Sequence, residues 1–547
     1  MRRRVPAISC LLLVIALLLI FRAGDGTEVP EPEAETAVVN SSNPVTGGSL
    51  DVGITGDLRT LDPHQAATAE ERMAARALTD SLFRFDFSDG LQGELLTGWE
   101  VREDGLVYVL YLRPGLEFFD GTACDAEAVR DNLVRMRQVG SPVMAGSWLS
   151  SIKEIEVVDE LEIHLVLWHP DPNLPFNLSR AETGLVSIPA AEQMEADFAQ
   201  APVGLGPFQV ASIPGEQDDQ GLQILPDVQA QGVDLVPVAH FVAFEDYWRG
   251  RAYIDSITLF EVTPGSDPAQ MLSGGLDLIP EVPPGYEVPE ELGYTFTRTN
   301  LDHHLIALNL SSSALTDVRV RMALDCAVDR RVIVEEVFGG DAQVLSIGDT
   351  PGAAYNGDVT EHAPARAKRL LDDAGYGESG IRLSLNMLSD DDPARVRASE
   401  ILAGQIRAIG VDVQLEVVPR EEYYDRMREG DYDISYWVLI PRLADCSAYT
   451  ANLHSDSYWN VSHLWRNQDM SEVRVAVDEL LQQAFESVDL QQRESLYRDF
   501  ARLAADEQLY ISLCSSEVRG AAIEGLRGMD VPYGFAFDFS RTWLRRR

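Results

Sequence analysis

The residues with the clearest capacity for chemistry lie between Tyr436 and Tyr449. Tyr436 and Trp437 are neighbours on an expected strand, Asp433 to Leu439, so one ring should face a cleft and the other the core. A ring at a cleft offers apolar area and can hold a cation, although core packing is an equal alternative for each ring. Arg442 could bind a carboxylate bidentately or be a solvated charge, the alternative that we favour. Tyr449 is a further aromatic candidate. The pattern indicates ligand binding rather than bond making.

Sequence signatures of enzymes are absent. The chain has no Gly-x-Ser-x-Gly, no His-Glu-x-x-His, no phosphate loop ending in Gly-Lys-Ser/Thr and no Cys-x-x-Cys. The adjacent His303 and His304 would point to opposite faces of a strand, so we expect ordinary strand positions rather than a metal site. His164 and His169 are expected at the surface. We therefore predict no catalysis, no cofactor and no metal.

The charge of the chain excludes some partners. Asp and Glu number 88 against 44 Lys and Arg, which gives a formal net charge of −44. Such an acidic excess argues against nucleic acid or an anionic lipid surface as the partner. Solubility is the favoured explanation of this charge, and a field tuned to a cationic ligand is the alternative.

The first residues form a targeting segment. Arg2, Arg3 and Arg4 precede an apolar run from Val5 to Phe21, which as a helix would be about 26 Å long. Cleavage after Gly26, which would make residues 1–26 a signal peptide, and retention of residues 5–21 as a membrane anchor both remain open. Either outcome places the rest of the chain outside the cytoplasm, in the periplasm or at the cell surface. Residues 27–48 are acidic and contain prolines, which predicts a disordered linker.

Folded structure should begin at Ser49 with an alternating strand. A capped helix is expected from Glu70 to Leu82, and a single amphipathic helix from Val318 to Phe338. We also expect hairpins at 99–112 and 152–167, helices at 124–137, 471–485 and 491–505, a loop insertion at 217–231 and a short strand at 509–513. Between Pro364 and Trp437 the pattern alternates helix and strand three times, which predicts one lobe of a mixed α/β protein.

These elements carry a series of short sequence fragments. They include Gly48-Ser-Leu-Asp-Val-Gly, Leu61-Asp-Pro-His, Phe119-Asp-Gly-Thr, Gly204-Leu-Gly-Pro-Phe, Tyr247-Trp-Arg-Gly, Ala367-Lys-Arg-Leu-Leu, His454-Ser-Asp-Ser and the closing Trp543-Leu544. Their order over roughly 500 residues resembles solute-binding family five, the bacterial peptide-binding and nickel-binding components of ABC importers. Most of this wording specifies fold rather than chemistry.

The resemblance implies an α/β clamshell of two lobes joined by a hinge, like a periplasmic binding protein with mixed sheets. The first lobe would be discontinuous, residues 49–298 together with 519–547, and the second would be residues 299–518. In peptide-binding members an aspartate shortly after a Trp-containing strand receives the ligand's ammonium group, which makes Asp445 the matching candidate. Cys446 stands where relatives often carry an aromatic residue, and this departure weakens the peptide assignment.

The same lobe assignment bears on the cysteines. Cys446 and Cys514 fall in one lobe and form our preferred disulfide. Cys124 and Cys326 fall in different lobes, where a bridge would restrain opening, so we expect both to be unpaired.

We therefore predict a monomeric, non-enzymatic solute-binding protein. It would capture a small solute, with a short peptide as the leading expectation, and deliver it to the permease subunits of an ABC importer. An exported hydrolase and a ligand-presenting sensor partner of the same fold are the alternatives. Turnover of peptides would favour the first, and a neighbouring receptor gene the second.

Overall fold

The computed structural model of the chain describes residues 44–86, 90–140, 148–211, 216–217, 223–224, 228–230, 233–263, 265–300, 302–349, 359–377, 381–439, 447–457, 459–487, 489–530 and 537–545. The predicted signal peptide or anchor, and the predicted linker as far as residue 43, lie outside this range. Among the described residues no helix combines the length and apolar character that crossing a membrane requires.

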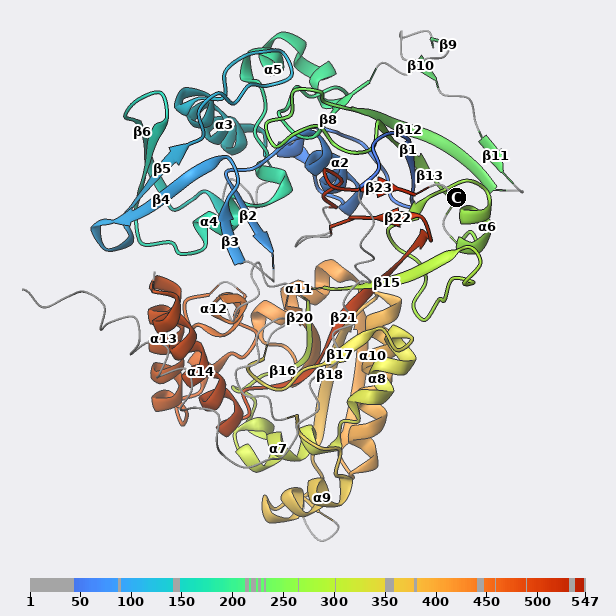
Figure 1. Cartoon of the computed structure of the whole chain (residues 1–547). Coiled ribbons are helices and arrows are strands. Elements are labelled where there is room, and N and C mark those ends of the chain that lie inside the picture. Colours follow the sequence, from blue (N-terminus) through green and yellow to red (C-terminus); the bar gives the residue numbers. More distant parts are fainter. Residues whose placement is uncertain are drawn as a thin grey trace, which may run out of the picture. The chain divides into compact units, whose positions relative to one another are not determined.

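A large mixed sheet runs through the fold (Figure 1). Its strands follow the order β11-β12-β13-β1-β14-β21-β16-β20-β18-β19, and β8, β15 and β17 pair beside this path. The bounds on the β1 side are β1 Ser49–Ile54, β8 Phe208–Val210, β11 Val228–Ala230, β12 Val233–Ala243, β13 Ser256–Glu261 and β14 Leu278–Ile279. Those on the β20 side are β16 His303–Leu308, β17 Ala342–Val344, β18 Ser384–Asp390, β19 Asp412–Val418 and β20 Ile434–Leu439.

Two strands connect these halves of the sheet. β21 (Tyr510–Ile523) pairs with β16 through its first residues and with β14 through its last. β15 (Gly293–Thr299) runs antiparallel to the later part of β21, and three residues separate it from β16. The chain therefore passes between the two halves twice, side by side.

Smaller sheets and helices complete the structure. The four-stranded sheet contains β4 Leu96–Arg102, β5 Val107–Leu112, β7 Glu162–Leu167 and β6 Ile152–Val157, and the strand pairs are β2 Phe83–Asp86 with β3 Gly90–Gly93, β9 Glu216–Gln217 with β10 Gln223–Ile224, and β22 Leu526–Arg527 with β23 Trp543–Leu544. The helices are α2 Ala69–Leu78, α3 Ala126–Val139, α4 Leu174–Asn177, α5 Ile188–Met194, α6 Pro268–Ser273, α7 Val318–Ala327, α8 Arg330–Phe338, α9 Pro364–Asp373, α10 Pro393–Ala408, α11 Arg420–Glu429, α12 Ser447–Leu453, α13 Ser471–Glu486 and α14 Leu490–Asp506.

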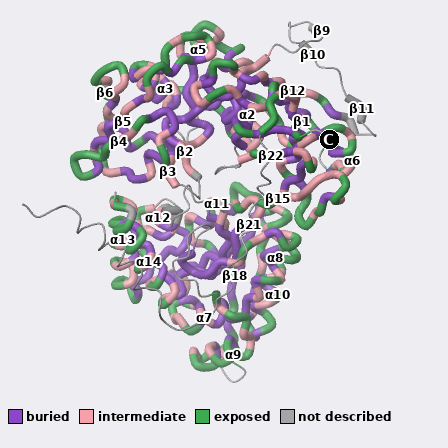
Figure 2. The backbone as a smooth tube through the Cα atoms, in the orientation of Figure 1, coloured by how far each residue is buried: buried purple, intermediate pink, exposed green. Residues whose placement is uncertain are grey.

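The hydrophobic core is divided along the sequence. The largest cluster of buried apolar residues draws only on residues between Leu305 and Cys514. Other clusters draw on residues before 289, and two of them also include residues after 520. Figure 2 shows the buried centre of the large sheet, with β18 and β21 in purple.

Local sequence signals account for many elements. α2 is capped, as expected: Thr68 forms a reciprocal capping box with Glu71, but the helix ends at Leu78 rather than Leu82. Asp104 and Gly105 both have positive φ angles and turn β4 into β5, which confirms the predicted hairpin. The hairpin of β6 and β7 and the helices α13 and α14 are also confirmed.

Other predictions were wrong in detail. The expected single helix from Val318 to Phe338 is two helices, because Val328 adopts an extended conformation and Asp329 caps α8 by accepting from the Arg331 amide. The helix expected at 124–137 begins at Ala126, where Asp125 caps it, and ends at Val139. The short strand expected at 509–513 continues to Ile523. Beyond Cys514, the last residue of the largest buried cluster, it pairs with β15.

Candidate functional site

The predicted binding residues fall into two groups. Asp445, Arg442 and Cys446 lie outside the described residues. Tyr436, Trp437 and Tyr449 are described, and all three belong to the largest buried cluster. The structure therefore shows what these rings contact inside the protein and which of the contacting residues reach the surface.

Tyr436 is held by a histidine and an aspartate. Its hydroxyl lies 2.7 Å from His304 Nδ1, and His304 Nε2 lies 3.0 Å from Asp302 Oδ2. Because a carboxylate only accepts, Nε2–H donates to Asp302, and in the neutral imidazole Nδ1 accepts from the tyrosine. Asp302 also accepts from the Ser516 amide at 2.8 Å. Burial raises the pKa of Tyr436 well above its ordinary value, so the phenol stays protonated.

Tyr449 lies on the other side of β16, the strand that carries His303 and His304. Its hydroxyl donates to the Asp349 carbonyl at 3.1 Å and lies 2.8 Å from His303 Nδ1. His303 Nε2 lies 2.7 Å from the Ser512 hydroxyl. Burial lowers the pKa of His303 to about 3, so this imidazole is neutral. His303 and His304 thus serve separate hydrogen-bond groups, in agreement with their predicted opposite directions.

Trp437 is the floor of an aromatic group that reaches the surface. The indole is 7% exposed, and Nε1–H donates to Asn452 Oδ1 at 3.1 Å. Its ring stacks on the buried Tyr423, with centroids 6.2 Å apart, and contacts Tyr424 and Trp459 at 6.1 and 6.2 Å. Tyr424 is half-buried, whereas Trp459 is 37% exposed. The rings therefore form a continuous set of contacts from the core to solvent.

Charged residues lie beside these rings at the end of β18. β18 is parallel to both β19 and β20, so the carboxyl ends of the three strands share one edge of the sheet. Asp390, the last residue of β18, has a fully buried side chain and accepts from Arg395 Nη1 at 3.0 Å. Arg420 Nε lies 3.5 Å from the same carboxylate oxygen. The other oxygen, Oδ1, is buried and has no hydrogen-bond partner in the described part of the chain.

Arg395 links the charged residues to the rings. Although burial opposes the shift, Asp390 and, to a smaller extent, Tyr423 and Tyr424 raise the pKa of Arg395, so its guanidinium lies near these rings. We call the combined set the strand-end site; its members are Asp390, Arg395, Arg420, Tyr424, Trp437 and Trp459. Carboxyl ends of parallel strands are the common location of ligand sites in open α/β sheets. An apolar surface with a few converging polar groups is typical of such sites.

Of the strand-end site, sequence reasoning identified only Trp437. Asp390, Arg395, Arg420, Tyr424 and Trp459 are dispersed over 70 positions, and no spacing rule joins them. The alternation of helices and strands did predict a sheet here, and parallel order would have pointed to residues that follow each strand.

A second set of parallel strands has its own small cavity. β1 is parallel to β13 and β14, and the carboxyl ends of β1 and β14 border a cavity of about 20 Å³, room for roughly one water. Arg298, Glu70 and Glu281 line it, and the Arg298 guanidinium lies over the Phe537 ring at 5.5 Å. Burial lowers the pKa of Arg298 to about 10, against the attraction of both glutamates.

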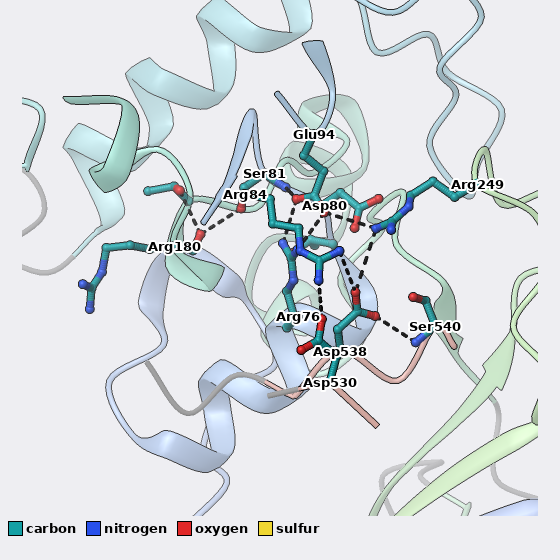
Figure 3. Close-up of polar contacts among 12 residues, drawn as sticks. Arg76, Asp80, Ser81, Arg84, Glu94, Arg180, Arg249, Asp530, Asp538 and Ser540 are labelled. Carbon is teal, nitrogen blue, oxygen red and sulfur yellow. Dashed lines mark hydrogen bonds and ion pairs between the residues drawn. The ribbon is translucent and has the colours of Figure 1, made fainter. Parts of the chain in front are cut away.

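An extended set of ion pairs lies in the same half of the chain (Figure 3). We call it the charged network; its members are Arg76, Asp80, Arg84, Glu94, Arg249, Asp530 and Asp538. Arg76 binds Glu94 bidentately, with N–O distances of 2.8 and 2.7 Å, and both side chains are buried. Arg84 pairs with Asp530, and Arg249 lies 3.5 Å from Glu94 and 3.9 Å from Asp538. The network joins α2, β2 and the chain's last residues.

Asp80 is a member of the network whose pKa is strongly raised. Its carboxylate accepts from the Tyr247 hydroxyl at 2.9 Å and from Trp248 Nε1–H at 2.6 Å. Burial, followed by repulsion from Glu94, raises the pKa of Asp80 to about 7, although Arg76 opposes the shift. Asp80 therefore binds a proton in the folded chain at pH values where an exposed aspartate has lost it.

The described cysteines bear on the predicted disulfide. Cys514 is a free, buried thiol, so the structure does not contain the predicted bridge to Cys446, which itself is not described. Cys514 lies within β21 between β16 and β17, where its neighbours are strand residues. Cys124 and Cys326 are also free and buried. Within the described residues, no three His, Cys, Asp or Glu side chains group in a way that could hold a metal ion.

Comparison with known proteins identifies the family. The model of the bacterial extracellular solute-binding proteins, family 5 (middle region), matches residues 90–460. The chain belongs to this family. It is thus an extracellular solute-binding protein, of the class that captures solutes for ABC importers.

Individual relatives are distant but cover nearly the whole chain. The glutathione-binding protein GsiB of Salmonella paratyphi A is 25% identical over 510 residues, which are 89% of this chain and 93% of GsiB. HbpA2 from Haemophilus parasuis superposes with a TM-score of 0.76 at 21% identity and covers 91% of this chain and all of that one. DppA from Helicobacter pylori, in complex with the peptide STSA, superposes with a TM-score of 0.64 at 21% identity over 92% and 99%. The fold is that of the two-lobed periplasmic binding proteins, as the sequence predicted.

Proposed function

We propose that this solute-binding protein captures a short peptide between its lobes and hands it to the permease subunits of an ABC importer. The lobes in this proposal are residues 49–298 with 519–547, and residues 299–518. The division of the hydrophobic core supports these bounds, because the largest cluster stays within 305–514 while Ala521 and Ala522 pack with residues before 289. β15 and β21 would then contain the hinge.

The strand-end site is the observation that carries the choice of ligand. It offers two guanidinium groups against one carboxylate, together with a partly exposed aromatic surface. A peptide carries a carboxylate, N–H donors and side chains, so it can use each of these groups. The named ligands of two relatives, glutathione and the peptide STSA, support a peptide.

Individual residues take different roles in this proposal. Trp437 supports the aromatic surface from below, and Tyr436 and Tyr449, whose hydroxyls are engaged by histidines, hold β20 and α12 in place behind it. Asp445 would accept the ligand's ammonium group and Arg442 would meet its carboxylate. Both follow β20 in the sequence.

Closure converts binding into a signal for the permease. A ligand shifts the equilibrium between open and closed forms only by the extra affinity that it has for the closed form. Contacts from both lobes provide that difference, because they exist together only when the lobes approach.

The remaining properties complete the proposal. The chain acts as a monomer without catalysis or cofactor, as a binding role requires none. It works outside the cytoplasm, and residues 5–21 either are removed with a signal peptide or remain as a membrane anchor.

Mass spectrometry of small molecules released from the purified protein tests the ligand class. We expect one short peptide, or a set of them, in about equimolar amount with the protein. Calorimetry with the same peptides should then give saturable 1:1 binding without hydrolysis. Release of a non-peptide solute, or turnover of the peptide, would contradict the proposal.

A further inference from the structure

We propose that Tyr424 and Trp459 form a subsite that takes an aromatic or large apolar side chain of the ligand. This inference rests on the proposed peptide function and adds a preference for one kind of peptide. It concerns two residues that the sequence patterns did not single out.

The first argument is the exposure of a large ring that the protein holds in place. Trp459 is 37% exposed, yet its ring contacts Tyr424 with centroids 5.5 Å apart and Trp437 at 6.2 Å. Arg428 lies over the same ring at 5.9 Å. A ring fixed on several sides loses little conformational freedom when a ligand covers its remaining surface, so binding there costs less.

The second argument is the chemistry of the surroundings. Beneath the two rings lies Trp437, whose indole N–H is already satisfied by Asn452, so the floor presents no unpaired donor. Near Tyr424 lies Arg395, which pairs with the buried Asp390. The polar groups thus lie at the margin of an apolar surface, where they can bind a peptide main chain while the rings bind its side chain.

The third argument is the contrast with a second exposed tryptophan in the same half of the chain. Trp465 is 48% exposed, and its one described ring contact is Arg466 at 4.7 Å. Among the described residues, no ring contact links Trp465 to a member of the strand-end site. Exposure of an aromatic ring alone therefore does not define the subsite, and Trp465 supplies a matched control.

The test compares two tripeptide probes, Ala-Phe-Ala and Ala-Ala-Ala, by calorimetry on the full extracytoplasmic chain. The native protein should bind the phenylalanine peptide on the order of 10-fold more tightly, as burial of an aromatic side chain predicts. Trp459→Ala should bring this ratio close to one, while Trp465→Ala should leave it unchanged. Tyr424→Ala is a second variant, and it should lower the ratio without abolishing binding of Ala-Ala-Ala. Circular dichroism melting curves would verify that each variant is folded.

The outcomes separate this subsite from the wider proposal. If both peptides bind but the ratio is one in the native protein, or survives in Trp459→Ala, the aromatic subsite is wrong and the peptide function stands. Equal loss in Trp465→Ala would also contradict it. If neither tripeptide binds, both the short-peptide function and this subsite are refuted.

Discussion

The charged network and the strand-end site differ in how completely their carboxylates are paired. In the charged network each guanidinium meets at least one carboxylate, and the central pair, Arg76 with Glu94, is bidentate and buried. In the strand-end site Asp390 keeps one buried oxygen without a partner in the described residues, and Trp459 keeps over a third of its surface exposed. The carboxylates of the charged network are already paired with guanidinium groups, whereas the exposed face of Trp459 can still contact a ligand.

This difference separates structure from function among residues of similar chemistry. The charged network joins α2 and β2 to Asp530 and Asp538 near the end of the chain, so we assign it to holding the returning tail in place (Figure 3). The strand-end site joins the ends of β18 and β20 to α10 and α11, and we assign it to the ligand.

The largest expected effect is the loss of stability when the charged network is broken. Arg76→Met keeps the apolar stem but leaves the Glu94 carboxylate buried without its partner, which should lower the free energy of unfolding by about 3–5 kcal/mol. Urea denaturation measures this loss. Arg102→Met, in the exposed pair with Glu100, is the control and should barely change stability. Similar values for the two variants would show that the network is not a structural device.

The next prediction compares the contributions of the buried Trp437 and the partly exposed Trp459 to stability. Trp437→Ala should leave a cavity in the core and lower the free energy of unfolding by about 3 kcal/mol. Trp459→Ala removes a ring that is already partly in water, so the loss should stay below about 1 kcal/mol. Thermal and urea unfolding of both variants checks the order. The reverse order would mean that Trp459 is a core residue.

A smaller effect is expected on affinity alone. Asp445→Asn removes one charge-assisted hydrogen bond to the ligand's ammonium group, so peptide affinity should fall by about 1–3 kcal/mol. Unfolding of the variant should match that of the native protein. Unchanged affinity by calorimetry would remove Asp445 from the site and leave the strand-end residues as the ligand's main polar contacts.

The last prediction is a pH dependence of the charged network. The folded-state pKa of Asp80 is raised from 3.8 to about 7, so between these values the folded chain holds a proton that the unfolded chain lacks. Its contribution to stability is therefore present below about pH 4 and lost as the pH rises toward 7. Asp80→Asn cannot titrate, so its stability relative to the native protein should rise over this window. A constant difference in urea midpoint would contradict the assignment.

The sequence predicted elements better than it predicted contacts between them. The Thr68 capping box and the Asp104-Gly105 turn are local, so their residue types alone indicate them. The break at Val328 was missed because the apolar stripe continues across it, and only the backbone angles separate α7 from α8. The strand-end site was missed for a different reason. Asp390, Tyr424 and Trp459 meet through the order of β18, β19 and β20, and strand order is a tertiary property.

A crystal structure of the protein saturated with the peptide that it releases tests the central claim most directly. The account predicts a peptide whose main chain lies at the carboxyl ends of β18 and β20, with a side chain against Trp459 and Tyr424, and an unchanged Arg76–Glu94 pair. A ligand seated within the charged network, or one that leaves the β18 and β20 ends untouched, would contradict it.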